Sequence, residues 1–130
     1  MSTRAIIAMP VKNGFETAWC WNDGGPANLG AQLRQHFKTE KDVEELIKLH
    51  SFSSIIGPQA LTELIVNGYF AADDRVERLN NNRLILKHKH DGDVIAGTGE
   101  NGFFENIEEM LNQDLNYVYV FRDGKWVTYK

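Results

Sequence analysis

Residues 19–30 read Trp19-Cys20-Trp21-Asn22-Asp23-Gly24-Gly25-Pro26-Ala27-Asn28-Leu29-Gly30. The segment contains two of the three tryptophans, the single cysteine and the densest group of turn-forming residues in the chain. From Phe15 to Trp21, alternate positions hold larger side chains, which is typical of a strand with one face on a core. The next four residues favour a turn, and Pro26 suits the first turn of a helix because its missing N–H would be unpaired there anyway. The sequence therefore predicts a strand, a tight corner and a helix start.

Trp21 and Asp23 have two possible interpretations. In the first, Trp21 is an ordinary core aromatic and Asp23 caps the helix that follows. In the second, both side chains face a groove beside free helical N–H groups, where they receive an anion or a side chain of a partner. Cys20 lies on the expected strand, which favours an unreactive buried thiol over a nucleophile.

The composition fits a single domain over residues 1–130. The chain is 42% hydrophobic and 25% charged, with a formal net charge of −4. A chain of this length can bury a core without metal or disulfide staples. Its acidic balance disfavours direct nucleic-acid binding and favours protein partners or solubility. One cysteine fits a reducing compartment, and the apolar run near the N-terminus is too short for a signal peptide or membrane span, so we expect a cytoplasmic protein.

Hydrophobic periodicity outlines the first half of the chain. Residues 4–9 are an expected strand, paired antiparallel with the next strand across an Asn13-Gly14 turn. Three expected helices cover residues 26–38, the segment after Thr39, and the segment from Pro58 to Asn67. Their expected core side chains are, in order, Leu29, Leu33 and Phe37; Val43, Leu46, Ile47 and His50; and Leu61, Leu64 and Ile65.

The second half has a less regular pattern that ends in a clear hairpin. The expected elements are a loop or short helix at 69–82, strands at 83–90 and 94–96, a helix at 101–113 with Phe103 and Phe104 on its apolar stripe, and a hairpin at 117–129 around Asp123-Gly124. The fold class is therefore α+β, with an antiparallel sheet built from the N- and C-terminal hairpins and packed by three to four helices.

Glu105, Glu108 and Glu109 give the expected 101–113 helix an acidic face. Such a face is usually a solvated surface. The alternative is a patch that competes for a basic groove on a partner protein.

Two motifs resemble chemical sites. Gly97, Gly99 and Gly102 have the glycine spacing of a dinucleotide-binding loop, but too little chain follows for the parallel strands of such a fold, so a flexible loop is favoured. His88 and His90 lie on the same side of an expected strand, yet no third or fourth ligand has suitable spacing. The sequence therefore predicts no catalytic residue, no metal and no cofactor.

Both ends of the chain and the corner together resemble a known group of proteins. The matching residues are Met1-Ser2-Thr3-Arg4-Ala5, Cys20-Trp21-Asn22-Asp23-Gly24 leading to Gly30, Glu45-Leu46-Ile47, Tyr117, Tyr119, Asp123-Gly124 and Trp126. They resemble small uncharacterised proteins common in bacteriophages and prophages, which typically begin with a Ser-Thr-Arg strand and have a Trp-Asp-Gly corner before a helix. Here Asn22 separates Trp21 from Asp23, the aromatic residue usual after Asp-Gly is missing, and residues 70–101 do not match. The group brings no activity, so no residue inherits a role.

The resemblance implies a class of function. Small acidic phage proteins often bind and block a host protein, frequently a defence nuclease of the CRISPR or restriction type, whose basic channels attract acidic patches. We therefore expect a non-enzymatic binder of a host protein. Its expected partner-binding residues are Trp21, Asp23, Glu105, Glu108 and Glu109.

Two alternatives stay open. One is a small-ligand-binding or enzymatic domain that uses the corner at Trp21 and Asp23. The other is a virion assembly or structural factor that self-associates through apolar side chains such as Tyr69, Phe70 and Trp126.

Overall fold

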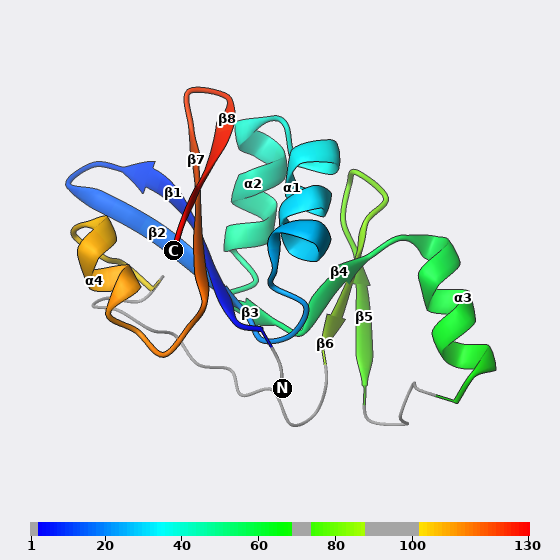
Figure 1. Cartoon of the computed structure of the whole chain (residues 1–130). Helices are drawn as coiled ribbons and strands as arrows, with labels where there is room; N and C mark the ends of the chain where they lie inside the picture. Colours follow the sequence, from blue (N-terminus) through cyan, green and yellow to red (C-terminus); the bar gives the residue numbers. More distant parts are fainter. Residues whose placement is uncertain (1–2, 69–73, 88–101) are drawn as a thin grey trace.

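A five-stranded sheet forms the centre of the part of the chain that the structure describes (Figure 1). The computed structural model describes residues 3–68, 74–87 and 102–130. The strands of this sheet are β1 (Ala5–Val11), β2 (Gly14–Cys20), β3 (Ser51–Phe52), β7 (Tyr117–Arg122) and β8 (Lys125–Tyr129), in the order β3-β2-β1-β7-β8. The β1–β2 and β7–β8 pairs are antiparallel, so both predicted hairpins are confirmed.

The two hairpins join through a parallel pair of strands. β1 and β7 are parallel, from Ala5 opposite Tyr117 to Ala8 opposite Val120, and β2 and β3 are parallel as well. The α+β class is confirmed, but the sheet is mixed and not antiparallel as predicted. The reason lies in β1, whose residues from Ala5 to Met9 are all buried. Strands covered on both faces are the ones that take parallel neighbours.

A smaller antiparallel sheet adjoins the first. Its strands are β4 (Ser54–Ile56), β5 (Arg75–Arg78) and β6 (Leu84–Lys87), in the order β4-β6-β5. β3 and β4 are nearly continuous, and between them the N–H of Ser53 donates to the carbonyl of Leu86 at 2.7 Å. β5 lies where a loop or short helix was predicted, because pairing with β6 outweighs its weak local pattern of charged residues.

Helices cover both faces of the larger sheet. On one face lie η1 (Pro26–Gly30), α1 (Ala31–His36) and α2 (Glu40–Ile47), as Figure 1 shows, and their buried side chains share a core with Ile7 and Tyr119. On the other face, α4 (Ile107–Leu111) packs on a second core that includes Ile6 and Val118. The predicted contacts of the first two helices are confirmed at Leu29, Leu33, Phe37, Val43, Leu46 and Ile47, all of which are buried.

The helix predicted at 101–113 is shorter than its sequence pattern indicated. Phe104 exchanges two backbone hydrogen bonds with Phe15, at 2.8 and 2.9 Å, and is therefore extended. The helix begins only after Asn106, whose side chain accepts from the N–H of Glu109 at 2.9 Å. Phe103 and Phe104 thus lie before the helix and not on its apolar stripe.

The last helix, α3 (Pro58–Val66), departs most from prediction. It has no buried residue, and Ile65 is 57% exposed. The predicted core contacts of Leu61, Leu64 and Ile65 are therefore wrong, because α3 follows β4 away from the larger sheet (Figure 1). Among the described residues, no helix has the length and apolar character needed to span a bilayer.

Candidate functional site

Hydrogen bonds fix the corner after β2 to the junction between the two sheets. The backbone N–H groups of Trp21 and Asn22 donate to the carbonyls of Phe52 and Ser53, at 3.0 and 2.9 Å. The side-chain amide of Asn22 also donates to Oγ of Ser53 at 2.7 Å. The thiol of Cys20 is buried, as expected, and donates to the carbonyl of Ser53 at 3.4 Å. The corner is therefore anchored along one side.

A second set of contacts connects the corner to β7 and to the residue Thr3 near the start of β1. The N–H of Gly24 donates to the carbonyl of Thr3 at 3.0 Å, and the hydroxyl of Tyr119 donates to the carbonyl of Gly24 at 2.7 Å. Burial, reinforced by neighbouring Tyr117, raises the pKa of Tyr119 above its ordinary value, so this hydroxyl stays protonated. A Cβ at Gly24 would lie 2.8 Å from the carbonyl oxygen of Thr3, so only glycine fits here.

Asp23 sits at the apex of this corner, and its carboxylate has no hydrogen-bond or ion-pair partner among residues 3–68, 74–87 and 102–130. Its backbone is left-handed, with φ of 56°, and its side chain is exposed. The residue before η1 is Gly25, and no side chain caps this helix. The backbone carbonyl of Asp23 accepts from the N–H of Leu29 at 3.1 Å, and the carbonyl of Gly25 accepts from the N–H groups of Asn28 and Gly30. The interpretation of Asp23 as a side-chain cap is therefore wrong. Its carboxylate is left available to a ligand.

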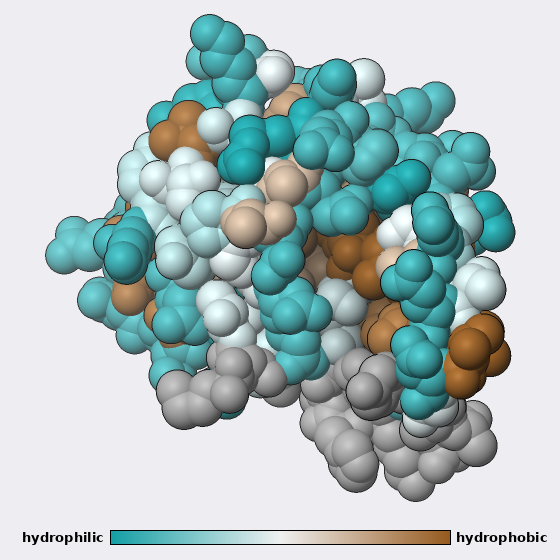
Figure 2. All heavy atoms as spheres, turned by 45° about the vertical axis from the view of Figure 1, so that its right-hand side comes forward, coloured by the Kyte–Doolittle hydropathy of each residue, from teal (hydrophilic) through white to brown (hydrophobic). Residues whose placement is uncertain are grey.

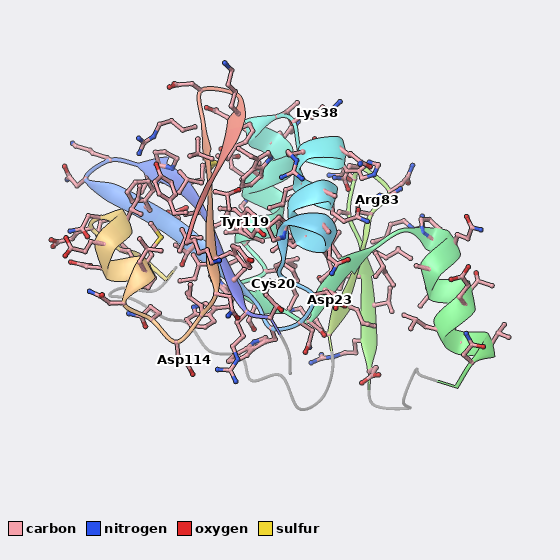
Figure 3. The ribbon with its side chains drawn as sticks, in the orientation of Figure 1. Cys20, Asp23, Lys38, Arg83, Asp114 and Tyr119 are labelled. Atoms are coloured by element: carbon pink, nitrogen blue, oxygen red, sulfur yellow. The ribbon has the colours of Figure 1, made fainter. Side chains whose placement is uncertain are left out.

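Asp23 lies where two hollows meet. The first, of about 370 Å³, is lined by Asp23, Glu63, Ser53, Ser54, Asn22, Asn67, Ile56, Ala60, Leu64 and Leu86. The second, of about 310 Å³, is lined by Asp23, Ala27, Asn28, Leu29, Ala31, Gln32, Gln35, Ile55, Ile56, Gly57 and Ala60. We call them the carboxylate hollow and the amide hollow, and together the Asp23 cleft. Figure 3 shows Asp23 beside β4, on the side of the larger sheet that faces α3.

The walls of the Asp23 cleft come from different parts of the chain. One wall is the corner with η1 and α1, the other is α3, and β4 and β6 contribute to the floor. Figure 2 shows hydrophobic atoms gathered in the depression between hydrophilic surfaces on this side of the molecule. The site therefore combines an apolar floor with polar walls, which is the usual construction of a binding site.

Trp21 is not part of the cleft. It lies against Trp19, with 5.5 Å between ring centroids, and the guanidinium of Arg4 stands 5.5 Å from the centroid of its ring. Arg4 also forms an ion pair with Asp114 at 2.9 Å. Trp21 lines neither hollow. The structure therefore separates it from Asp23, although the two residues are adjacent in the predicted site.

Of the three predicted glutamates, Glu105 lies just before α4, and Glu108 and Glu109 lie in its first turn. Figure 1 shows α4 on the opposite face of the larger sheet from α1 and α2. Glu105 and Glu108 are exposed. Glu109 is half-buried, and its carboxylate accepts from the backbone N–H of Glu105 at 3.4 Å. Glu109 thus completes the N-terminal cap of α4, and of the three glutamates only Glu105 and Glu108 are exposed.

The structure tests only some of the remaining sequence predictions. His88, His90, Gly97, Gly99, Tyr69 and Phe70 lie outside the described residues. Within the described ranges, no group of three His, Cys, Asp or Glu residues is placed to bind a metal ion. Trp126 is partly buried and donates from Nε1 to the carbonyl of Phe37 at 2.8 Å, so it is a packing residue and not an exposed apolar contact.

Sequence reasoning missed Glu63, Gln32 and the whole contribution of α3 to the site. Its pattern of Leu61, Leu64 and Ile65 resembles a core stripe, and nothing local shows that the helix lies at an edge. The only available signal was Glu63 within that stripe. Comparison of the chain with protein-family models, curated proteins and solved structures finds no match.

Proposed function

We propose that this chain is a non-enzymatic binding protein that holds a segment of a partner protein in the Asp23 cleft. The observation that supports it most directly is the free carboxylate of Asp23 where two hollows of about 370 and 310 Å³ meet. Hollows of roughly this size, with an apolar floor and a few polar groups, are typical ligand sites. Because the two hollows share Asp23, Ile56 and Ala60, an extended segment can contact both of them at once.

The resemblance to phage proteins supports a host protein as the partner. Binding would then block the host protein, and a defence nuclease is the class that best matches an acidic ligand of net charge −4. Such enzymes hold nucleic acid in basic channels. In this proposal the chain acts in the host cytoplasm as an inhibitor and does not itself bind nucleic acid.

The α4 face is the second candidate contact surface. Glu105 and Glu108 are both exposed on it. If this face imitates a polyanion, its charges provide the affinity and the Asp23 cleft has no role in binding. The two surfaces lie on opposite faces of the larger sheet, so substitutions can test them separately.

Affinity capture from a host lysate tests the proposal when it compares variants. Ala60→Trp fills the point where both hollows meet, and Ala60 lies on a helix without buried residues, so the fold should tolerate the change. Glu105→Lys with Glu108→Lys is the matched change on α4. Nuclease treatment of the lysate removes partners bridged by nucleic acid.

We expect a stoichiometric host protein to be retained by the wild type and by the α4 variant, and to be lost with Ala60→Trp. If only the α4 variant fails to retain the host protein, the acidic face and not the cleft would be the binding surface. Retention by all three proteins, or by none, would contradict binding in the cleft.

Small-ligand binding at the same place is the alternative, because a hollow of about 370 Å³ also fits a metabolite. A thermal-shift screen against nucleotides and divalent metals addresses it. A ligand present at a hundred times its dissociation constant stabilises the fold by about 2.7 kcal/mol. A shift that Ala60→Trp abolishes would favour this alternative.

A further inference from the structure

We infer that the carboxylate hollow binds a basic side chain, arginine or lysine, from an extended segment of the partner protein. This inference rests on the proposed function and specifies the chemistry of the partner. It depends on the charge, the floor and the neighbouring groups of the hollow.

Charge is the first reason. Asp23 on the corner and Glu63 on α3 line the same hollow from opposite walls. Among residues 3–68, 74–87 and 102–130, no Lys, Arg or His lines the hollow and none forms an ion pair with either carboxylate. Two unpaired carboxylates across one hollow attract a cation that reaches both of them.

The floor indicates which kind of cation fits. Beside its polar residues, the hollow is lined by the apolar side chains of Ile56, Leu64 and Leu86. A long basic side chain places its aliphatic stem on such a surface and its charged head among the carboxylates. A bare metal ion gains nothing from an apolar floor and requires more oxygen ligands than these two side chains provide.

The amide hollow supports an extended segment around that side chain. Asn28, Gln32 and Gln35 line it with groups that donate and accept hydrogen bonds. Asn28 and Gln35 are exposed, so their amide groups can pair with the backbone N–H and C=O groups of a segment lying along the cleft.

Arg83 determines which hollow receives the basic side chain. A Cβ at Gly57 would lie 2.9 Å from Nη1 of Arg83, so the guanidinium lies directly against a residue that lines the amide hollow. This cation repels a second basic group at that end. The basic side chain of the partner therefore enters the carboxylate hollow.

Peptide binding measured by NMR tests the inference. The probes are blocked peptides Gly-Ser-Ala-X-Ala-Ser-Gly, where X is arginine, lysine, norleucine or glutamate, titrated into the isotope-labelled full chain. We expect the arginine and lysine peptides to shift the backbone resonances of Asp23, Gly24, Ile56, Glu63 and Leu64, and the norleucine and glutamate peptides not to. Added salt should weaken the effect, since the carboxylates are solvent-accessible.

The decisive variant combines Asp23→Asn with Glu63→Gln. Asparagine tolerates the left-handed backbone at position 23, and glutamine keeps the size of the side chain at 63, so the fold is preserved. We expect roughly a tenfold or greater loss of affinity for the arginine peptide. The matched control, Glu40→Gln with Glu44→Gln, removes the same charge from exposed positions on α2 and should bind as the wild type does.

Several outcomes would overturn the inference. These are equal binding of the norleucine and arginine peptides, equal loss in the variant and its control, and no shift with any peptide at millimolar concentration. If Ala60→Trp abolishes capture of the host protein but no peptide binds, binding in the cleft stands. Only the inference that a basic side chain enters the carboxylate hollow is then refuted. If Ala60→Trp leaves capture unchanged, the proposed function itself fails.

Discussion

The two walls of the Asp23 cleft are held in very different ways. The corner wall is fixed by the contacts of Gly24 with Thr3 and Tyr119, and by those of Asn22 with Ser53. The α3 wall has no buried residue, and Val66 is 78% exposed. Because helices in proteins owe most of their stability to tertiary packing, α3 contributes little to the fold. The cleft therefore has one wall fixed by buried hydrogen bonds and one wall whose helix has no buried residue.

The largest expected difference between the walls is in the cost of removing a leucine. Leu33 of α1 is fully buried, so Leu33→Ala should lower the free energy of unfolding by about 2–5 kcal/mol. Leu64 of α3 is only partly buried, so Leu64→Ala should cost less than about 1 kcal/mol. Urea denaturation of both variants measures the difference. Equal costs would show that α3 is an integral part of the core.

A smaller effect is expected from single hydrogen bonds. Tyr119→Phe leaves the buried carbonyl of Gly24 without its donor and should cost about 1–3 kcal/mol. On the other wall, Thr62 donates to the carbonyl of Pro58 at 3.3 Å from an exposed position. Thr62→Val should therefore change stability by no more than about 0.5 kcal/mol. Thermal unfolding of the two variants provides the comparison, and an unchanged midpoint for Tyr119→Phe would contradict a rigid corner.

The two walls also differ in how well the sequence predicts them. The corner follows from local chemistry: Asn22 to Gly25 favour a turn, and Pro26 begins the helix. The burial of Leu33 and Phe37 follows from helical spacing. For α3 the same rule failed, because spacing identifies an apolar face but not the surface that covers it. The exposure of α3 depends on where β4 directs the chain, which is a tertiary property.

Long-range pairing accounts for the other errors. Phe104 is extended because it pairs with Phe15, far away in sequence, and β5 is a strand because it pairs with β6. The parallel pairing of β1 with β7 also joins the two ends of the chain. Of the candidate site, the sequence identified Asp23 but not Glu63, since no local pattern indicates which residue of α3 faces the corner.

A pH effect on stability is expected from His36 at the end of α1. Burial, and then the charges of Arg83 and Lys38, lower the pKa of His36 below its ordinary value. The imidazole of His36 is therefore protonated more readily in the unfolded chain than in the folded one. Its contribution to the free energy of unfolding is fully present above about pH 6.5 and is lost as the pH decreases toward the folded-state pKa. His36→Gln should remove this part of the pH dependence of the unfolding free energy, and Arg83→Gln should make this part smaller. Denaturation at a series of pH values measures it, and an unchanged slope in His36→Gln would contradict the assignment.

The smallest effect on stability is expected from the α4 face. Glu105 and Glu108 are exposed, so Glu105→Lys with Glu108→Lys should change the unfolding free energy by no more than about 1 kcal/mol. This near-neutrality makes the variant a fair control for binding. A large loss of stability would disqualify it, and circular dichroism during heating is sufficient to detect one.

Hydrogen exchange of the chain with and without its captured partner tests the central claim most directly. Without the partner, the amides of α3 should exchange much faster than those of α1, because α3 lacks buried contacts. With the partner, the account predicts strong new protection across residues 58–66 and weaker new protection across 22–32. Protection confined to residues 105–111, with α3 unchanged, would contradict binding in the Asp23 cleft.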